Sequence, residues 1–123
     1  MVAPTYRFDT IVAFAPNGAP QLAPGFLIMY ARGPHSNYLN NASGVLDLIF
    51  GHASIRFEQR AASLSFPPMA LALGTHTRGQ LAADIADHVR DHLQGHDIAL
   101  FERIRLVDVR QGANGIWTVS LDI

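Results

Sequence analysis

The chain has 123 residues, of which 49% are hydrophobic and 15% charged, and its formal net charge is -1 at neutral pH. A chain of this length buries roughly two thirds of its unfolded surface, so one globular domain over residues 1–123 needs no cofactor or disulfide for stability. The composition excludes intrinsic disorder, and the lack of a basic field argues against nucleic acid as a partner.

Cysteine and lysine are both absent from the sequence. Without cysteine there is no disulfide framework, zinc ribbon or thiol nucleophile, and without lysine there is no Schiff-base chemistry. The chain opens without the pattern of a signal peptide, and its apolar runs are shorter than the roughly 20 residues that span a bilayer. We therefore expect a cytoplasmic protein with no membrane contact. This expectation includes a protein that is made in the cytoplasm and then incorporated into a particle.

The first third of the chain predicts two strands separated by a long loop. Residues 6–14 alternate between apolar and polar side chains, which is typical of a strand with one buried face. Pro16 begins a turn, and residues 21–25 predict the rest of the loop. Residues 26–32 are apolar on both faces and predict a central strand.

The middle of the chain predicts an antiparallel meander or sandwich. Residues 35–44 are polar, rich in turn formers and aperiodic, so we expect a loop there. Residues 45–50 fit either a short helix or a buried strand, and a strand is favoured because residues 55–60 alternate beyond the next turn and would complete a hairpin. Further strands are predicted at 62–66 and 69–73.

A single amphipathic helix is predicted over about residues 77–94. Thr75 or Thr77 supplies the side-chain oxygen of the N-cap, and Gly95 ends the helix. Six apolar side chains fall within about 140° of one another at 100° per residue, which is the stripe of a helix packed on a sheet: Leu81, Ala82, Ile85, Ala86, Val89 and Leu93.

A β-hairpin closes the chain, with residues 101–110 paired to residues 116–123 across an Asn114-Gly115 turn. The apolar phase slips by one residue between Leu106 and Val107, which predicts a β-bulge. The expected fold is therefore α+β: a mainly antiparallel sheet of about seven strands, as a sandwich or open barrel, with one packed helix and a C-terminal hairpin.

The nearest approach to a chemical signature lies on the helix. His88 and His92 are one turn apart and Asp84 is one turn earlier, a spacing that permits a shared metal ion with an open position for water. The segment lacks the glutamate of the zinc protease motif, and its simplest interpretation is a solvated shoulder whose histidines hydrogen-bond to Asp84 and Asp91. We predict no cofactor and no metal, with His88, His92 and Asp84 as the candidate ligands if one binds.

Two function hypotheses follow from these observations. The leading one is a non-enzymatic interaction or assembly module, a homo-oligomer whose partner is itself or another protein. Ring- or tube-forming components of phage tails and related injection machines offer a fold-level analogy. The alternative is a small enzyme or ligand-binding protein that takes a small molecule where the helix meets the sheet, around His88 and His92. His76 and Trp117 are further interface or ligand candidates.

Overall fold

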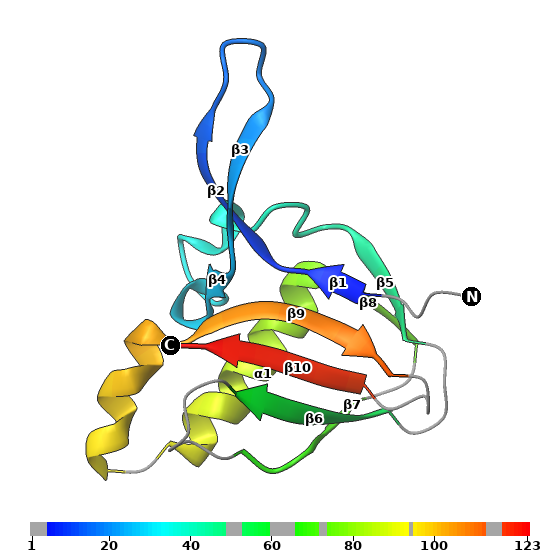
Figure 1. The fold of residues 1–123 in the computed structure, drawn as a ribbon, viewed down its shortest axis with the longest axis vertical. Helices are drawn as coiled ribbons and strands as arrows, with labels where there is room; N and C mark the ends of the chain where they lie inside the picture. The colour runs from blue at the N-terminus through cyan, green and yellow to red at the C-terminus, as the bar shows by residue number, and fades with distance from the viewer. Residues whose placement is uncertain (1–4, 49–52, 60–65, 72–73, 94, 113–116) are drawn as a thin grey trace.

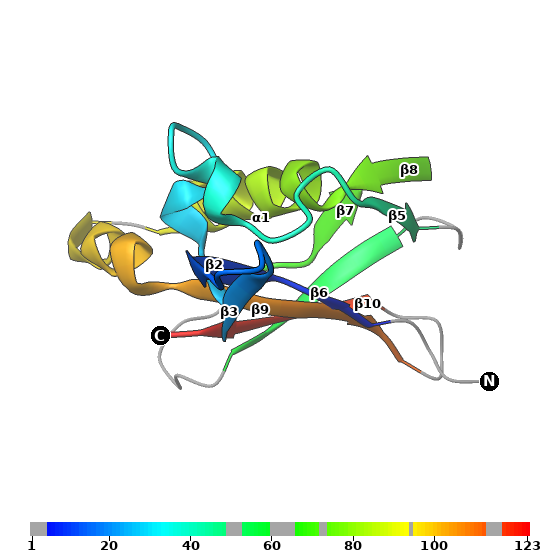
Figure 2. The ribbon, with the colours of Figure 1, turned by 90° about the horizontal axis from the view of Figure 1, so that it is seen from above.

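The computed structural model describes residues 5–48, 53–59, 66–71, 74–93, 95–112 and 117–123. A twisted sheet forms one layer of the body, and the helix α1 crosses one of its faces (Figure 2). A two-stranded arm extends away from this body (Figure 1).

The main sheet has the strand order β1-β9-β10-β6-β7, and β4 also pairs with β9. The β9–β10 hairpin at its centre is antiparallel, whereas β10 and β6 run parallel. The bounds of these strands are β1 Thr5–Arg7, β4 Phe26–Leu27, β6 Ala53–Gln59, β7 Met69–Leu71, β9 Arg105–Gln111 and β10 Trp117–Asp122. Both termini of the described chain therefore contribute to one sheet.

Helix α1 spans Arg78–His92 and begins with a reciprocal capping box. The Gln80 amide donates to the Thr77 hydroxyl oxygen (3.1 Å), and the Thr77 amide donates to the Gln80 side-chain oxygen (3.0 Å). Two amide protons that the first turn cannot satisfy within the helix gain acceptors in this way. The predicted start at Thr77 is confirmed. The helix ends before Leu93, whose backbone is extended, rather than at Gly95.

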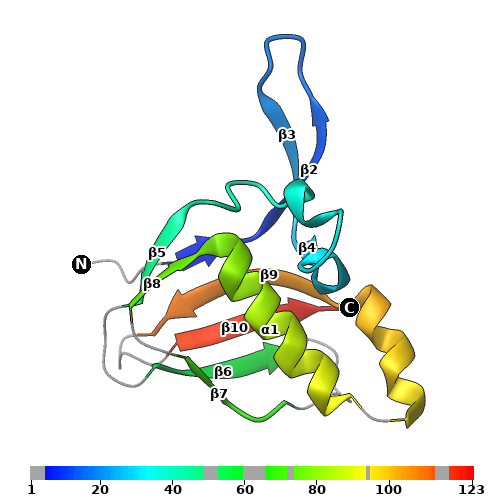
Figure 3. The same ribbon diagram turned by 180° about the vertical axis from the view of Figure 1, so that it is seen from behind.

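The predicted apolar stripe of α1 faces the core. All six of its members are buried, and they pack with the inward side chains of β9 and β10, among them Leu106, Val109, Trp117, Val119 and Leu121. Figure 3 shows α1 crossing these strands. Full burial of each Leu, Ile or Val side chain contributes about 1.5 to 3 kcal/mol, so the helix closes the core as expected from its sequence.

The α+β class, the mainly antiparallel sheet, the packed helix and the C-terminal hairpin are all confirmed. The predicted bulge is confirmed as well. Ser120 pairs with Asp108 and Leu121 pairs with Leu106, which leaves Val107 as the extra residue of β9. The Asn114-Gly115 turn lies outside the described residues.

Strand partners were harder to predict than strands. Residues 45–48 do form a strand, β5 (Val45–Leu48), but it pairs with β8 (Gly74–Thr77) and not with β6. The predicted hairpin between residues 45–50 and 55–60 is therefore wrong. Apolar alternation reports which face of a strand is buried, and it carries no information about the neighbouring strand.

The described residues contain three 3₁₀ helices, and two of them replace part of an expected strand. The predicted strand at 26–32 is limited to β4, after which Ile28–Tyr30 form the 3₁₀ helix η1. A second 3₁₀ helix, η2, covers Ser36–Tyr38, and a third, η3, covers Gly95–Arg103, where the closing hairpin was expected to begin at residue 101. Short apolar runs fit either structure, because periodicity needs more residues to distinguish them.

Residues 62–65 of the strand expected at 62–66 and residues 72–73 of the strand expected at 69–73 lie outside the described residues. Within the described part, no helix is long and apolar enough to cross a membrane.

Candidate functional site

Among the described residues, the two large apolar side chains with the highest exposed fractions, Phe14 and Val12, lie on a hairpin that projects from the body (Figure 1). It consists of β2 (Asp9–Phe14), a turn and β3 (Pro20–Pro24), and these residues 9–24 are called the arm. The single strand predicted at 6–14 is broken at Phe8, which is fully buried and donates its amide to the Val107 carbonyl (3.0 Å). The loop predicted at 21–25 is wrong, since most of it is β3.

The tip of the arm is held by local hydrogen bonds. The Ala15 amide donates to the Ala19 carbonyl (2.8 Å), and the Ala19 amide donates to the side-chain oxygen of Asn17 (3.1 Å). Gly18 has a φ of +85°, a conformation that glycine adopts at no steric cost. The sequence therefore specifies the hairpin through its turn residues.

Three large apolar side chains of the arm are open to solvent: Val12 is 61% exposed, Phe14 67% and Leu22 43%. No Asp, Glu, Lys or Arg occurs between Asp9 and Arg32. Soluble proteins rarely expose an uncharged, apolar projection of this kind, and where they do it marks a binding surface. The arm is the candidate functional site on these grounds.

The two edges of the arm differ. On β3, Pro20 and Pro24 lack amide protons, so this edge cannot form a continuous ladder with another strand. On β2, the ladder is interrupted by a bulge between Ile11 and Ala13. Both devices oppose indiscriminate strand addition, so the arm offers a partner its side chains rather than a backbone ladder.

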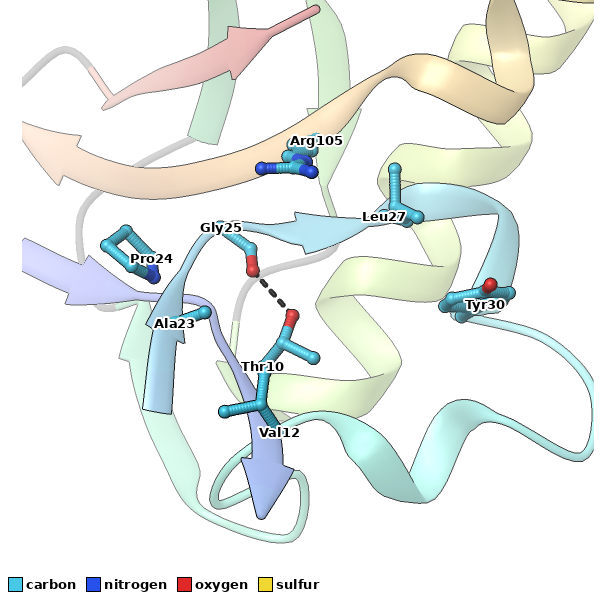
Figure 4. Close-up of a pocket in the computed structure, with 8 residues that line it drawn as sticks. All are labelled: Thr10, Val12, Ala23, Pro24, Gly25, Leu27, Tyr30 and Arg105. Carbon is cyan, nitrogen blue, oxygen red and sulfur yellow. Dashed lines mark hydrogen bonds between the residues drawn. The ribbon is translucent and has the colours of Figure 1, made fainter. Parts of the chain in front are cut away.

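A cavity of about 150 Å³ lies at the root of the arm (Figure 4). Gly25, with a φ of +83°, lets the chain turn closely over β9, and its carbonyl accepts a hydrogen bond from the Thr10 hydroxyl (2.6 Å). The lining is predominantly apolar with one cation at the rim: Thr10, Val12, Ala23, Pro24, Gly25, Leu27, Tyr30 and Arg105.

The root is also fixed to α1 by Arg78, the first residue of the helix. Its Nε donates to the Arg7 carbonyl (2.8 Å), and its guanidinium lies 5.8 Å from the centre of the Phe8 ring. Partial burial lowers the pKa of Arg78, opposed by the charge of Asp9. The backbone just before the arm is therefore held by a charged hydrogen bond and a cation–π contact.

The histidines of the helix shoulder lie side by side, with ring centres 4.3 Å apart. Nε2 of His88 donates to the Pro67 carbonyl (2.8 Å), and Nδ1 of His92 donates to the His88 carbonyl (2.7 Å). Because a carbonyl oxygen only accepts, each of these nitrogens carries a proton. A shared ion would thus have to use Nδ1 of His88 and Nε2 of His92.

The carboxylates expected near these rings have other contacts. Asp84 lies 4.0 Å from Arg32, whose main partner is Asp87 (2.7 Å), and Asp91 lies 4.0 Å from Arg90. The hydrogen bond and charge of Asp87 raise the pKa of Arg32. The described residues contain no group of three or more His, Asp or Glu side chains placed to hold a metal ion.

The remaining candidates lie elsewhere. His76 is half-buried on β8, opposite Leu46, and precedes the N-terminus of α1. About 15 Å of helix separates that end from His88. Trp117 is a core residue, 1% exposed and stacked on Tyr6 at 5.8 Å. The structure thus does not gather the four interface or ligand candidates at one place.

Sequence reasoning missed the arm, and one signal was available: the run without charge from residue 10 to residue 31. Comparison with known proteins adds no assignment, because no family model, curated protein or solved structure matches the chain.

Proposed function

We propose that the protein is a non-enzymatic assembly module that associates with itself through the arm. The observation that supports this function is the uncharged projection bearing Val12, Phe14 and Leu22. Covering these side chains removes apolar surface from water without desolvating any charge of the arm between residues 10 and 24.

The size of this surface sets the kind of association. Fully burying a Val, Leu or Phe side chain contributes about 1.5 to 3 kcal/mol, so burying the exposed fractions of the three side chains contributes about 2.5 to 5 kcal/mol. A micromolar Kd requires about 8 kcal/mol, after the cost of association has been met. One arm bound at one site is therefore a weak contact, and an assembly that is stable at micromolar concentration needs at least two such contacts per subunit.

Two exposed valines provide a matched test. Val12 on the arm is 61% exposed and Val45 on β5 is 60% exposed. Val12→Ser should weaken association about fivefold or more per contact, whereas Val45→Ser should leave it unchanged. Sedimentation velocity over a range of concentrations measures both variants against the wild type.

The expected wild-type result is a concentration-dependent mass above that of one chain. A strict monomer at high micromolar concentration contradicts the proposal. An equal effect of Val12→Ser and Val45→Ser would show that association does not use the arm.

A further inference from the structure

The cavity at the root of the arm has the size of a single aromatic ring. Its volume is about 150 Å³, and an apolar cavity of that volume in a protein interior takes up benzene. The guanidinium of Arg105 at the rim favours the face of an aromatic ring over an aliphatic group. The volume and the lining of this cavity therefore favour a phenyl group as its occupant.

The larger cavity, lined by residues of η2, α1 and the segments next to them, is a poorer match. It measures about 350 Å³, and its lining includes Ser36, Asn37, Thr77 and Gln80. A phenyl ring would leave much of this space unfilled and would cover polar groups without offering them a partner.

The chain itself carries a suitable ring. Among the described residues, the exposed large aromatic side chains are Phe14 and Tyr38. Tyr38 already stacks on His35, with ring centres 5.3 Å apart. Phe14 lies on the arm near its tip and is 67% exposed.

Phe14 does not line the cavity of its own chain, and it points to the face of the arm opposite to Thr10 and Ala23, which do line it. Phe14 opposes Pro20 on β3, which shares a face with Leu22. Thr10, which lines the cavity, opposes Ala23 on the other face. Opposed residues of a ladder point to the same side, and neighbours along a strand point to opposite sides.

We propose that Phe14 of one copy inserts into the arm-root cavity of a second copy, an inference that rests on the proposed function. Donor and acceptor are different surfaces of each subunit, so the contact is head-to-tail. Head-to-tail contacts produce closed rings when the rotation closes and filaments when it does not. Each subunit then makes the two contacts that the limited apolar surface of one arm requires.

The charge distribution favours a second copy as the occupant. The donor carries no charge between residues 10 and 24, and among the cavity-lining residues only Arg105 is charged. Insertion therefore brings no two like charges together at this contact. A guanidinium and an aromatic ring are a complementary pair, and the same chain supplies both.

Two variants separate the donor from the acceptor. Phe14→Ser removes the ring and keeps the cavity, while Ala23→Phe fills the cavity and keeps the ring. Each variant alone should be monomeric at a concentration where the wild type associates. At a higher concentration, where a single contact suffices, an equimolar mixture should form one-to-one pairs that grow no further, as measured by sedimentation velocity.

Circular dichroism of each variant checks the fold, and Val45→Phe is the control for adding a ring outside the arm. If Ala23→Phe does not fold, Arg105→Gln replaces it and should weaken association about two- to fivefold by loss of the cation–π contact.

The outcomes distinguish this inference from the proposed function. A monomeric wild type overturns both. Association that Phe14→Ser leaves unchanged overturns the insertion of Phe14, even if Val12→Ser still weakens association through the arm. A mixture of the two variants that stays monomeric at that higher concentration overturns the head-to-tail arrangement, because an intact donor and an intact acceptor then fail to bind each other.

Discussion

Replacing Arg78 by methionine tests what holds the root of the arm. Methionine preserves much of the apolar stem but removes the hydrogen bond to the Arg7 carbonyl and the contact with the Phe8 ring. Hydrogen bonds from charged groups stabilise proteins by about 1.5 to 3 kcal/mol. The bond from Arg78 is exposed to solvent, so the lower value of about 1.5 kcal/mol is used. The cation–π contact adds about 0.5 to 1 kcal/mol.

One effect opposes this loss. Arg78 places a positive charge at the N-terminus of α1, where the helix dipole makes a cation unfavourable by about 0.3 to 1 kcal/mol. The net expectation is that Arg78→Met lowers the free energy of unfolding by about 1 to 2 kcal/mol. Urea denaturation followed by circular dichroism measures this change.

Arg90→Met is the matched control, because Arg90 is on the same helix and its side chain is 53% exposed. It should change the free energy of unfolding by less than about 0.5 kcal/mol. If Arg78→Met has no larger effect than Arg90→Met, the contacts of Arg78 do not hold the root of the arm, and the reasoning is refuted.

Two further predictions concern the helix. Ile85→Asp places a charge at a fully buried position and should abolish the cooperative unfolding transition; a retained transition near the wild-type temperature would contradict the packing of α1. For the helix shoulder, protein purified without a His-tag should contain far less than one equivalent of zinc by elemental analysis, since no third His, Asp or Glu among the described residues joins the two rings in a metal-binding group. Stoichiometric zinc that is lost in His88→Ala and His92→Ala would instead favour the alternative function.

Local features of the fold were predictable from the sequence because short-range chemistry determines them. The Thr77 cap, the stripe containing Ile85 and the phase slip at Val107 are each written within a few residues. Strand partners were not predictable, because β6 pairs with β10 across a long separation in the sequence. Periodicity gives the buried face of a strand, and tertiary packing chooses its neighbour.

The candidate site was likewise predictable only in its local features. The spacing of His88 and His92 correctly placed the two rings next to each other. It could not indicate that Pro67 would accept a hydrogen bond from one of them, since that contact comes from a distant segment. The arm was obscured because residues 21–25 carry two turn formers, Pro24 and Gly25, and prolines are unusual within strands.

The strand order has a consequence for the timing of folding. β1 and β4 both pair with β9, so the N-terminal part of the sheet has no partner until residues 105–111 have been synthesised. Pairings of such high sequence separation are slow, whereas the arm is a local hairpin that needs only its own residues. Both strands of the arm are therefore present before β9 is synthesised, but an isolated two-stranded hairpin is only marginally stable, so the arm becomes stably ordered when β9 anchors its root.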